Sequence, residues 1–401
     1  MTMNETSSHT SETFPWGQRA LQHARILTES TPGRGSATHL EAQAAIYVQQ
    51  ALTQAGYEVN RQPFIGLRSI WFFLALVFGL ATMGHLAGPL LGVALLPWGV
   101  WALRTALFGY AFFMLQRKFS FQRFPLRASL PQGPSQNLIA VAAPTGETRR
   151  RVVINAHLDS HRAVIWFAND FLTRLYAGLT PLVIYGLLLA PLMYALRLLT
   201  GLTVFSWLGG TFGMLHFLTW FTGVTADLGP YSPGANDNAA SLGVLLTLAE
   251  RLRREPLADT EVWLVATGCE ETGCDGMIAF LDAHADDLCD ALFLDLEVSG
   301  IGDELAYVAA EGVVQTRRIA PSLAEMLAAH DAQPFSLAHI GAYTEGGVLW
   351  SRGRRGACLM SRPAGTHTIP EWHRMTDTAD KLQPAALQRM HDFVWGVVKA
   401  E

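Results

Sequence analysis

The stretch RVVINAHLD, residues 151–159, decides the fold. Its first six residues form a largely apolar run that predicts a buried strand. His157 and Asp159 follow as a His-x-Asp pair, so their side chains point to one face of the strand. In an open α/β sheet, ligands bind outside the carboxyl ends of the strands. The stretch therefore predicts a sheet with a polar site at one edge.

Similar strands alternate with helices along the rest of the polar sequence. Strands are predicted at 137–142, 261–266 and 291–296, with an edge strand at 57–64. Helices are predicted at 38–55, 239–253, 277–284, 321–330 and 384–399. This alternation predicts an α/β sandwich around a largely parallel or mixed sheet. Residues 1–13 are predicted to form a loose tail.

The overall composition excludes several classes of protein. Only 16% of the 401 residues are charged and 50% are hydrophobic, whereas a soluble domain carries roughly 25% charged residues. This deficit excludes a disordered chain and argues against a purely soluble enzyme. The net charge of −5 gives no reason to expect a nucleic acid as partner. The four cysteines are too few for a disulfide framework and are expected to be reduced thiols.

Two hydrophobic blocks with almost no charged residues account for the hydrophobic excess. No Asp, Glu, Lys or Arg lies between Arg68 and Arg104, within 175–196 or within 198–226. A membrane-spanning helix needs roughly 20 apolar residues, so we expect four transmembrane helices in two hairpins. The predicted spans are 69–87 and 91–115, which reverse at Gly88-Pro89, and 176–196 and 202–224, which reverse at 197–201. The alternative is a pair of buried hairpins in a soluble core.

The flanking charges predict the orientation. Each hairpin returns the chain to the side that it left, so the polar sequence lies on one side of the membrane. That side carries most of the basic residues near the helix ends: Arg68, Arg117, Lys118, Arg123, Arg127, Arg162 and Arg174. The positive-inside rule therefore predicts an integral protein of the cytoplasmic (inner) membrane with its main domain in the cytoplasm. Arg104, inside the second span, is expected to snorkel toward the hairpin tip; the alternative is that it faces the other hairpin.

Acidic and imidazole side chains gather in five short motifs at strand ends or in nearby loops. The motifs are HLD (157–159), GANDN (234–238), EETG (270–273), LDL (294–296) and WHRMTDT (372–378). Two imidazoles and three carboxylates suit Zn²⁺, and the oxygen ligands also tolerate Mn²⁺ or Co²⁺. Two cations need a bridging carboxylate, for which Asp237 is the natural candidate, and the bridged water becomes acidic enough to attack a carbonyl. Of Glu270 and Glu271, one can ligate while the other accepts the proton of the water, and Asp159 can orient the His157 ring.

The order of these motifs resembles metallopeptidase family twenty-eight, which contains zinc aminopeptidases, glutamate carboxypeptidase and glutaminyl cyclases. Residues 31–64 are similar to the opening helix and strand of that family, so the resemblance covers nearly all of the polar sequence. It implies a zinc exopeptidase-like α/β fold, a three-layer sandwich with a mixed, mostly parallel sheet and two inserted transmembrane hairpins. The expected peptidase domain comprises 1–68, 117–163 and 227–401, and the hairpins comprise 69–116 and 164–226.

The resemblance also implies the ligands of two zinc ions. His157, Asp237 and Asp295 would bind one ion, and Asp237 would bridge to a second ion on Glu271 and His373. Glu270 would be the general base and Asp159 the partner of His157.

Several nearby residues compete for these roles. Glu297 is an alternative to Asp295, which the motif register favours. His367 competes with His373, which Asp377-Thr378 follows as in the family motif. His161 and His216 are not expected to be ligands, Cys269 and Cys274 are expected to be packing residues, and Thr344–Glu345 resembles a loop that lines the substrate pocket.

The predicted function is a membrane-anchored two-zinc exopeptidase, an aminopeptidase that hydrolyses the N-terminal bond of a peptide substrate. One alternative is glutaminyl-cyclase-like, carboxypeptidase or amidohydrolase activity on the same scaffold. Cyclases of this family work with one zinc ion, whereas residues for both sites are present here. The other alternative is a non-catalytic membrane scaffold, like nicastrin, although such relatives have usually lost ligands.

Gly209, Gly210 and Gly213 permit close helix packing and hence a homodimer.

Overall fold

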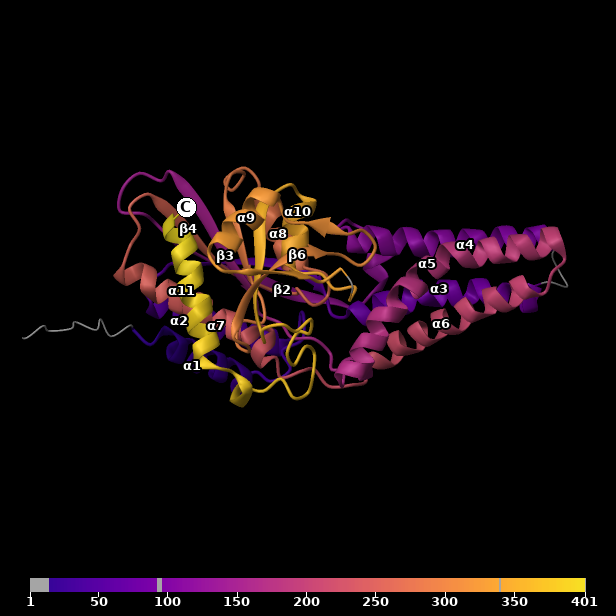
Figure 1. Ribbon diagram of the computed structural model, residues 1–401, viewed down its shortest axis with the longest axis horizontal. Helices are drawn as coiled ribbons and strands as arrows, with labels where there is room; N and C mark the ends of the chain where they lie inside the picture. The colour runs from indigo at the N-terminus through magenta and orange to yellow at the C-terminus, as the bar shows by residue number, and fades with distance from the viewer. Residues whose placement is uncertain (1–13, 92–95, 339, 401) are drawn as a thin grey trace, which may run out of the picture.

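The computed structural model describes residues 14–91, 96–338 and 340–400. The tail predicted at 1–13 lies outside the described residues. The chain forms an α/β part at one end and a bundle of long helices at the other (Figure 1). The two parts are joined at the edge of the sheet where the predicted polar motifs lie.

The α/β part is built on a nine-stranded sheet in the order β1-β2-β4-β3-β5-β9-β6-β7, with β8 paired to β6. The strands are β1 Val59–Leu67, β2 Gln132–Ala142, β3 Arg150–His157, β4 Thr260–Thr267, β5 Leu292–Leu296, β6 Glu304–Glu311, β7 Arg317–Arg318, β8 Gln333–Ser336 and β9 Arg355–Arg362. Parallel pairing joins β4, β3, β5 and β9 in the middle, and β6 to β8. The remaining described pairs are antiparallel. The sheet is mixed, as predicted, but parallel pairs do not predominate.

Helices cover both faces of the sheet, which makes three layers. Along β3, Val152 and Ile154 face one apolar cluster and Val153 faces another. Such burial on both faces explains why the central strands are continuous apolar runs. The first cluster contains α1 Trp16–Ser30, α2 His39–Gln54, α7 Ala240–Arg254, α9 Pro321–Ala329 and α11 Pro384–Ala400. The second cluster contains α8 Asp275–Ala283 and α10 Glu345–Ser351.

The bundle consists of α3 Ile70–Leu91, α4 Pro97–Phe119, α5 Asp170–Thr200 and α6 Val204–Ala226. Within the described residues, three of these helices, α3, α4 and α5, are long and apolar enough to cross a membrane. The uncharged α6 packs against α3 and α5, but its glycines, threonines and His216 lower its mean hydropathy. The turn predicted at 197–201 agrees with the structure only at its end, because α5 continues to Thr200 and Gly201 ends it in a left-handed conformation. The reversal predicted at Gly88-Pro89 is wrong, since Pro89 lies inside α3.

Arg104 of α4 donates a hydrogen bond to a backbone carbonyl of α3 that has no helical donor because of Pro89. Proline has no N–H, so the carbonyl of His85, four residues earlier, lacks its helical partner. Arg104 Nη2 donates to this oxygen at 3.2 Å, and Nε donates to the carbonyl of Gly84 at 3.1 Å. The guanidinium also lies 3.9 Å above the ring of Tyr194 on α5. Arg104 therefore contacts its own hairpin through α3 and the other hairpin through Tyr194.

A chain of hydrogen bonds continues from Tyr194 through the bundle. Its hydroxyl lies 2.8 Å from His85 Nδ1, and His85 Nε2 lies 3.0 Å from His216 Nδ1. His216 Nε2 donates to the carbonyl of Val183 at 3.0 Å. Both nitrogens of His216 are therefore occupied by protein partners. This residue joins α3, α5 and α6, and among the described residues it belongs to no group able to hold a metal.

The pairing of Arg104 with the His85 carbonyl can be tested with a double-mutant cycle. Pro89→Ala restores an N–H to this carbonyl, which then no longer depends on Arg104. We expect Arg104→Leu to destabilise the protein more in the Pro89 background than in the Pro89→Ala background, by about 1 kcal/mol. The unfolding free energies of the four proteins in detergent measure this difference. Equal effects in both backgrounds would contradict the pairing.

Candidate metal centre

The candidate centre lies at the carboxyl ends of three neighbouring parallel strands. His157 is the last residue of β3, Glu270 and Glu271 follow β4, and Glu297 follows β5. Two further loops complete it. Residues 235–239, with Asp237, lead into α7, and His373 lies in the segment before α11. The sequence prediction of a polar site at this edge of the sheet agrees with the structure.

Asp237 lies between two groups of side chains. Its Oδ1 is 3.2 Å from His157 Nε2, which is also 3.3 Å from Glu297 Oε2. Its Oδ2 is 3.4 Å from His373 Nε2, which is 3.2 Å from Glu271 Oε2. Each oxygen of one carboxylate thus faces a different imidazole, which is the arrangement that a carboxylate bridging two cations requires.

The chemistry of these residues fits divalent metal ions. Three sets of side chains bring one ligand atom each to within 4.8 Å of the others: His157–Asp237–Glu297, His161–Glu271–His373 and His157–Glu270–Glu271. All of these side chains are buried. Among the described residues, Glu271 Oε1 is buried without a hydrogen-bond partner. Buried acids and imidazoles with open coordination positions are the donors that Zn²⁺ takes.

Burial without a cation disfavours the charged form of these acids. It raises the pKa of Glu297 to about 8 and the pKa of Glu271 to about 7, and nearby Asp237 adds to both shifts. Burial, together with Glu297 and Glu271, raises the pKa of Glu270 well above its usual value. A divalent cation would supply the positive charge that ionised carboxylates need in this environment.

Asp295 lies outside these metal-capable groups, which favours Glu297 over it as the ligand. Its Oδ1 accepts a hydrogen bond from Asn155 Nδ2 at 2.6 Å, and its Oδ2 accepts one from the Gly346 N–H at 3.1 Å. Asp295 and Glu297 are two residues apart and so share a face of the strand. Asp295, however, is still within β5, whereas Glu297 has passed its end and reaches His157. That position relative to the strand end is the signal that separates the two acids.

His161, which the sequence analysis set aside, lies against the centre. Its ring stacks on His373 with 3.8 Å between the ring centroids. Its Nδ1 donates to the carbonyl of Arg162 at 2.8 Å, so Nε2 is left as an acceptor. His367 belongs to no metal-capable group among the described residues. Thr344 lines the adjoining cavity, whereas Glu345 is buried behind it and accepts hydrogen bonds from Asn155 and Thr267.

Asp159 holds the strand-end loops together. Its Oδ1 accepts the N–H of Glu270 and its Oδ2 the N–H of Glu271, both at 3.1 Å. Ser36 donates its hydroxyl to the same carboxylate at 2.5 Å. The carbonyl of Asp159 lies 3.0 Å from His157 Nδ1, which fixes the proton on Nδ1 and directs the lone pair of Nε2 to the centre.

Two buried residues without a predicted role fix the Asp237 loop. Asp377 accepts the N–H groups of Asn236 and Asp237 at 2.7 and 3.1 Å. Arg34 donates to three loop carbonyls, those of Leu158, Pro233 and Gly234. Sequence patterns do not identify Arg34, because its partners are backbone oxygens far away in the sequence.

The three layers, a mixed sheet with helices on both faces, and the polar site at the carboxyl ends of its strands are typical of the zinc exopeptidase fold. The structure is similar to a glutaminyl cyclase from Bacteroides thetaiotaomicron bound to N-acetylhistamine, with a TM-score of 0.57, 12% identity and coverage of 96% of this chain and 98% of the other. An aminopeptidase from Aneurinibacillus sp. strain AM-1 gives a TM-score of 0.54, 14% identity and coverage of 95% and 93%. BSAP, a zinc aminopeptidase from Bacillus subtilis, gives a TM-score of 0.54, 14% identity and coverage of 96% of each chain.

The sequence itself matches one family model, Peptidase family M28, over residues 216–398. The matched segment contains Asp237, both glutamates after β4, Glu297 and His373, and it begins after His157 and Asp159. No curated protein matches the chain. The partial match to this family agrees with the zinc-dependent metallopeptidase that the sequence predicts, and the neighbours share the fold of the chain.

Two substitutions separate the roles of the competing acids. We expect Glu297→Gln to bind less zinc per chain than the wild type, because an amide is a weaker ligand than a carboxylate. We expect Asp295→Asn to keep its zinc but to lose about 1–3 kcal/mol of stability, because it disturbs two buried hydrogen bonds. Elemental analysis and thermal unfolding of the purified variants test this, and the reverse pattern would restore Asp295 as the ligand.

Proposed function

We propose that the chain is a membrane-anchored two-zinc aminopeptidase. The observation that carries this proposal is the position of Asp237, whose two oxygens face His157 and His373 at 3.2 and 3.4 Å. A site for a single metal would not need one carboxylate to face two separate imidazoles. A non-catalytic scaffold would not need the full set of buried acids.

The ligand sets follow from these distances. His157, Asp237 and Glu297 would hold one zinc ion, and Asp237, Glu271 and His373 would hold the other. Mn²⁺ or Co²⁺ would suit the same oxygen-rich set. When bound, the metal supplies a Lewis acid that polarises the peptide carbonyl and lowers the pKa of the attacking water.

The protein's own residues would move the proton. Glu270 offers an oxygen within 4.8 Å of ligand atoms of His157 and Glu271, and it is the candidate general base. It would accept the proton of the attacking water and return it to the leaving amine. Asp159 acts as a positioning residue, because it holds the N–H groups of both glutamates and the His157 ring.

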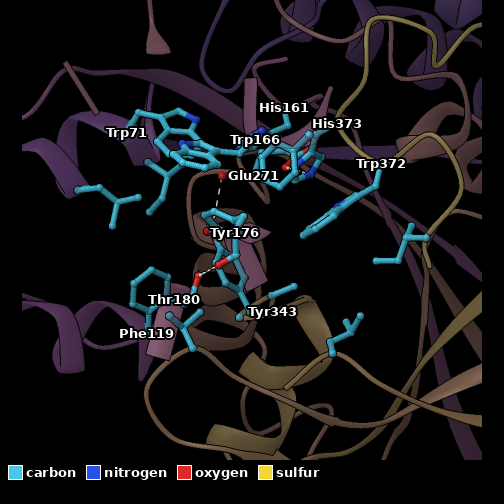
Figure 2. A pocket seen from close by; sticks show the side chains of 18 of the residues that line it. Trp71, Phe119, His161, Trp166, Tyr176, Thr180, Glu271, Tyr343, Trp372 and His373 are labelled. Atoms are coloured by element: carbon cyan, nitrogen blue, oxygen red, sulfur yellow. Dashed lines mark hydrogen bonds and ion pairs between the residues drawn. The ribbon is translucent and has the colours of Figure 1, made fainter. Parts of the chain in front are cut away.

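The lining of the cavity beside the centre favours an aminopeptidase over a carboxypeptidase. Among the described residues that line it, none is Arg or Lys. A carboxypeptidase needs a cation to bind the free carboxylate of its substrate. The acids present are those that we assign to the metal ions and to the general base, so the lining offers no cationic side chain for a free C-terminus. Figure 2 shows aromatic side chains, among them Trp71, Trp166 and Tyr343, around the part of this space next to Glu271 and His373.

The bundle supports the membrane part of the proposal. The three apolar helices α3, α4 and α5, together with α6, would form two hairpins in the cytoplasmic membrane. The basic residues at the helix ends, such as Arg117 and Arg174, lie on the side of the α/β part. This distribution favours a cytoplasmic catalytic domain.

Glu270→Gln tests the proposed base. Glutamine has nearly the same shape but accepts no proton, so we expect zinc content to be retained and turnover of a dipeptide with a free N-terminus to fall by about 10²–10⁴-fold. Glu58→Gln, at an exposed position, is the control and should match the wild type. Full activity of Glu270→Gln would exclude Glu270 as the base. An N-blocked dipeptide should not be cleaved, and one zinc ion per wild-type chain would favour the cyclase alternative.

A further inference from the structure

The cavity at the candidate metal centre continues into the helical bundle. Its polar end is formed by the side chains of the centre, including His157, Glu270 and His373. The other end lies among α3, α5 and α6. There it is lined by Leu74, Phe78, Val183, Ile184, Leu215 and Leu218. One continuous space therefore joins the site of hydrolysis to the inside of the bundle.

The bundle end of this cavity is suited to an apolar group. Three threonines line it, but their hydroxyls already have partners. Thr180 and Thr219 donate to the carbonyls of Tyr176 and Leu215 on their own helices, and Thr222 accepts from Trp166 Nε1. Among the described lining residues of these helices, none is charged. A polar group placed there would lose its hydration without gaining a charged partner.

The length of the apolar lining exceeds what a standard side chain fills. On α3 the lining runs from Ile70 to Phe78, and on α5 from Tyr176 to Ile184. Eight residues of helix correspond to roughly 12 Å along the helix axis. Neither leucine nor phenylalanine extends this far from its Cα atom. The space therefore fits a longer, linear apolar chain.

Aromatic rings surround the junction between the two ends. Trp71, Trp166, Tyr176, Tyr343 and Trp372 lie around the space next to Glu271 and His373 (Figure 2). Phe167 packs edge-on against His373, with 4.8 Å between the ring centroids. A chain that passes from the centre into the bundle would run between these rings, which shield its apolar part from water.

We propose that the bundle end of the cavity binds a long alkyl chain on the N-terminal residue of a peptide that partitions into the bilayer. This inference rests on the proposed aminopeptidase function. The scissile bond and the free α-amine would lie at the metal centre. The chain carried by the same residue would extend between α3, α5 and α6. The preferred substrates would be lipid-modified peptides with a free N-terminus.

The experiment uses the full-length protein in lipid nanodiscs and a series of dipeptides with a free amine. Their N-terminal residue is alanine, norleucine, 2-aminooctanoic acid or 2-aminododecanoic acid, followed by the same second residue. We expect kcat/KM to rise by roughly threefold for each added methylene until the cavity is filled, because each buried methylene adds apolar contact. A kcat/KM that peaks at norleucine and falls for longer chains would overturn the inference.

Two matched variants test whether the preference for long side chains arises at the bundle end of the cavity. Leu218→Trp narrows the bundle end of the cavity, whereas Leu208→Trp changes a similarly exposed position of the same helix that does not line it. We expect Leu218→Trp to lower kcat/KM for the 2-aminododecanoyl peptide by at least tenfold and to leave the alanyl peptide unchanged. Leu208→Trp should behave like the wild type with both. An equal loss on both peptides in Leu218→Trp would contradict the inference.

The same assays distinguish this inference from the proposed function. If no peptide with a free amine is cleaved, the aminopeptidase function fails. If alanyl and norleucyl peptides are cleaved and longer chains give no gain, the function stands and the alkyl-chain site fails. Faster cleavage of an N-dodecanoyl peptide, which has no free amine, would overturn the proposed occupant and point to an N-acyl amide.

Discussion

The carboxylate of Asp237 is the group on which the candidate site depends. Its two oxygens face two imidazoles from distant parts of the chain, so an error of an ångström in its loop would separate the two halves of the centre. Ala235 and Ala239 of this loop pack into the apolar core. Hydrogen bonds to buried charged groups, Asp377 on one side and Arg34 on the other, fix the loop further. Such charge-assisted bonds are short and directional, which a metal centre requires.

Most of the site could be predicted because parallel strands end at a common edge. His157, Glu270 and Glu271 follow apolar runs in the sequence, and those runs are the central strands β3 and β4. The choice between Asp295 and Glu297 could not be made in this way. Both acids point to the same face, and only the place where β5 ends decides which one reaches the centre. Residues such as Arg34, which bond to backbone, leave no pattern in the sequence.

The fold could be predicted where the sequence shows clear apolar patterns of strands and helices, and not where these patterns are weak. The central strands were expected, but β6 and β9 were not, because their alanines, glycines and charged ends are atypical of strands. In the bundle, Pro89 suggested a turn, since proline normally breaks a helix. It remains inside α3 because a residue of another helix, Arg104, satisfies the carbonyl that Pro89 leaves open. Tertiary contacts of this kind cannot be read from a single segment.

The positions in the sequence at which the bundle helices are inserted connect the bundle to the candidate metal centre. The hairpin formed by α5 and α6 begins after Asp159 and ends before Asp237, so both of its ends lie in segments that carry residues of the centre. A hairpin inserted at the far edge of the sheet would anchor the protein equally well. Inserted here, its helices instead become walls of the cavity that contains His157 and Glu271. This placement favours a role for the bundle in forming the substrate site, because anchoring alone does not require that the helices and the metal-capable residues share one cavity.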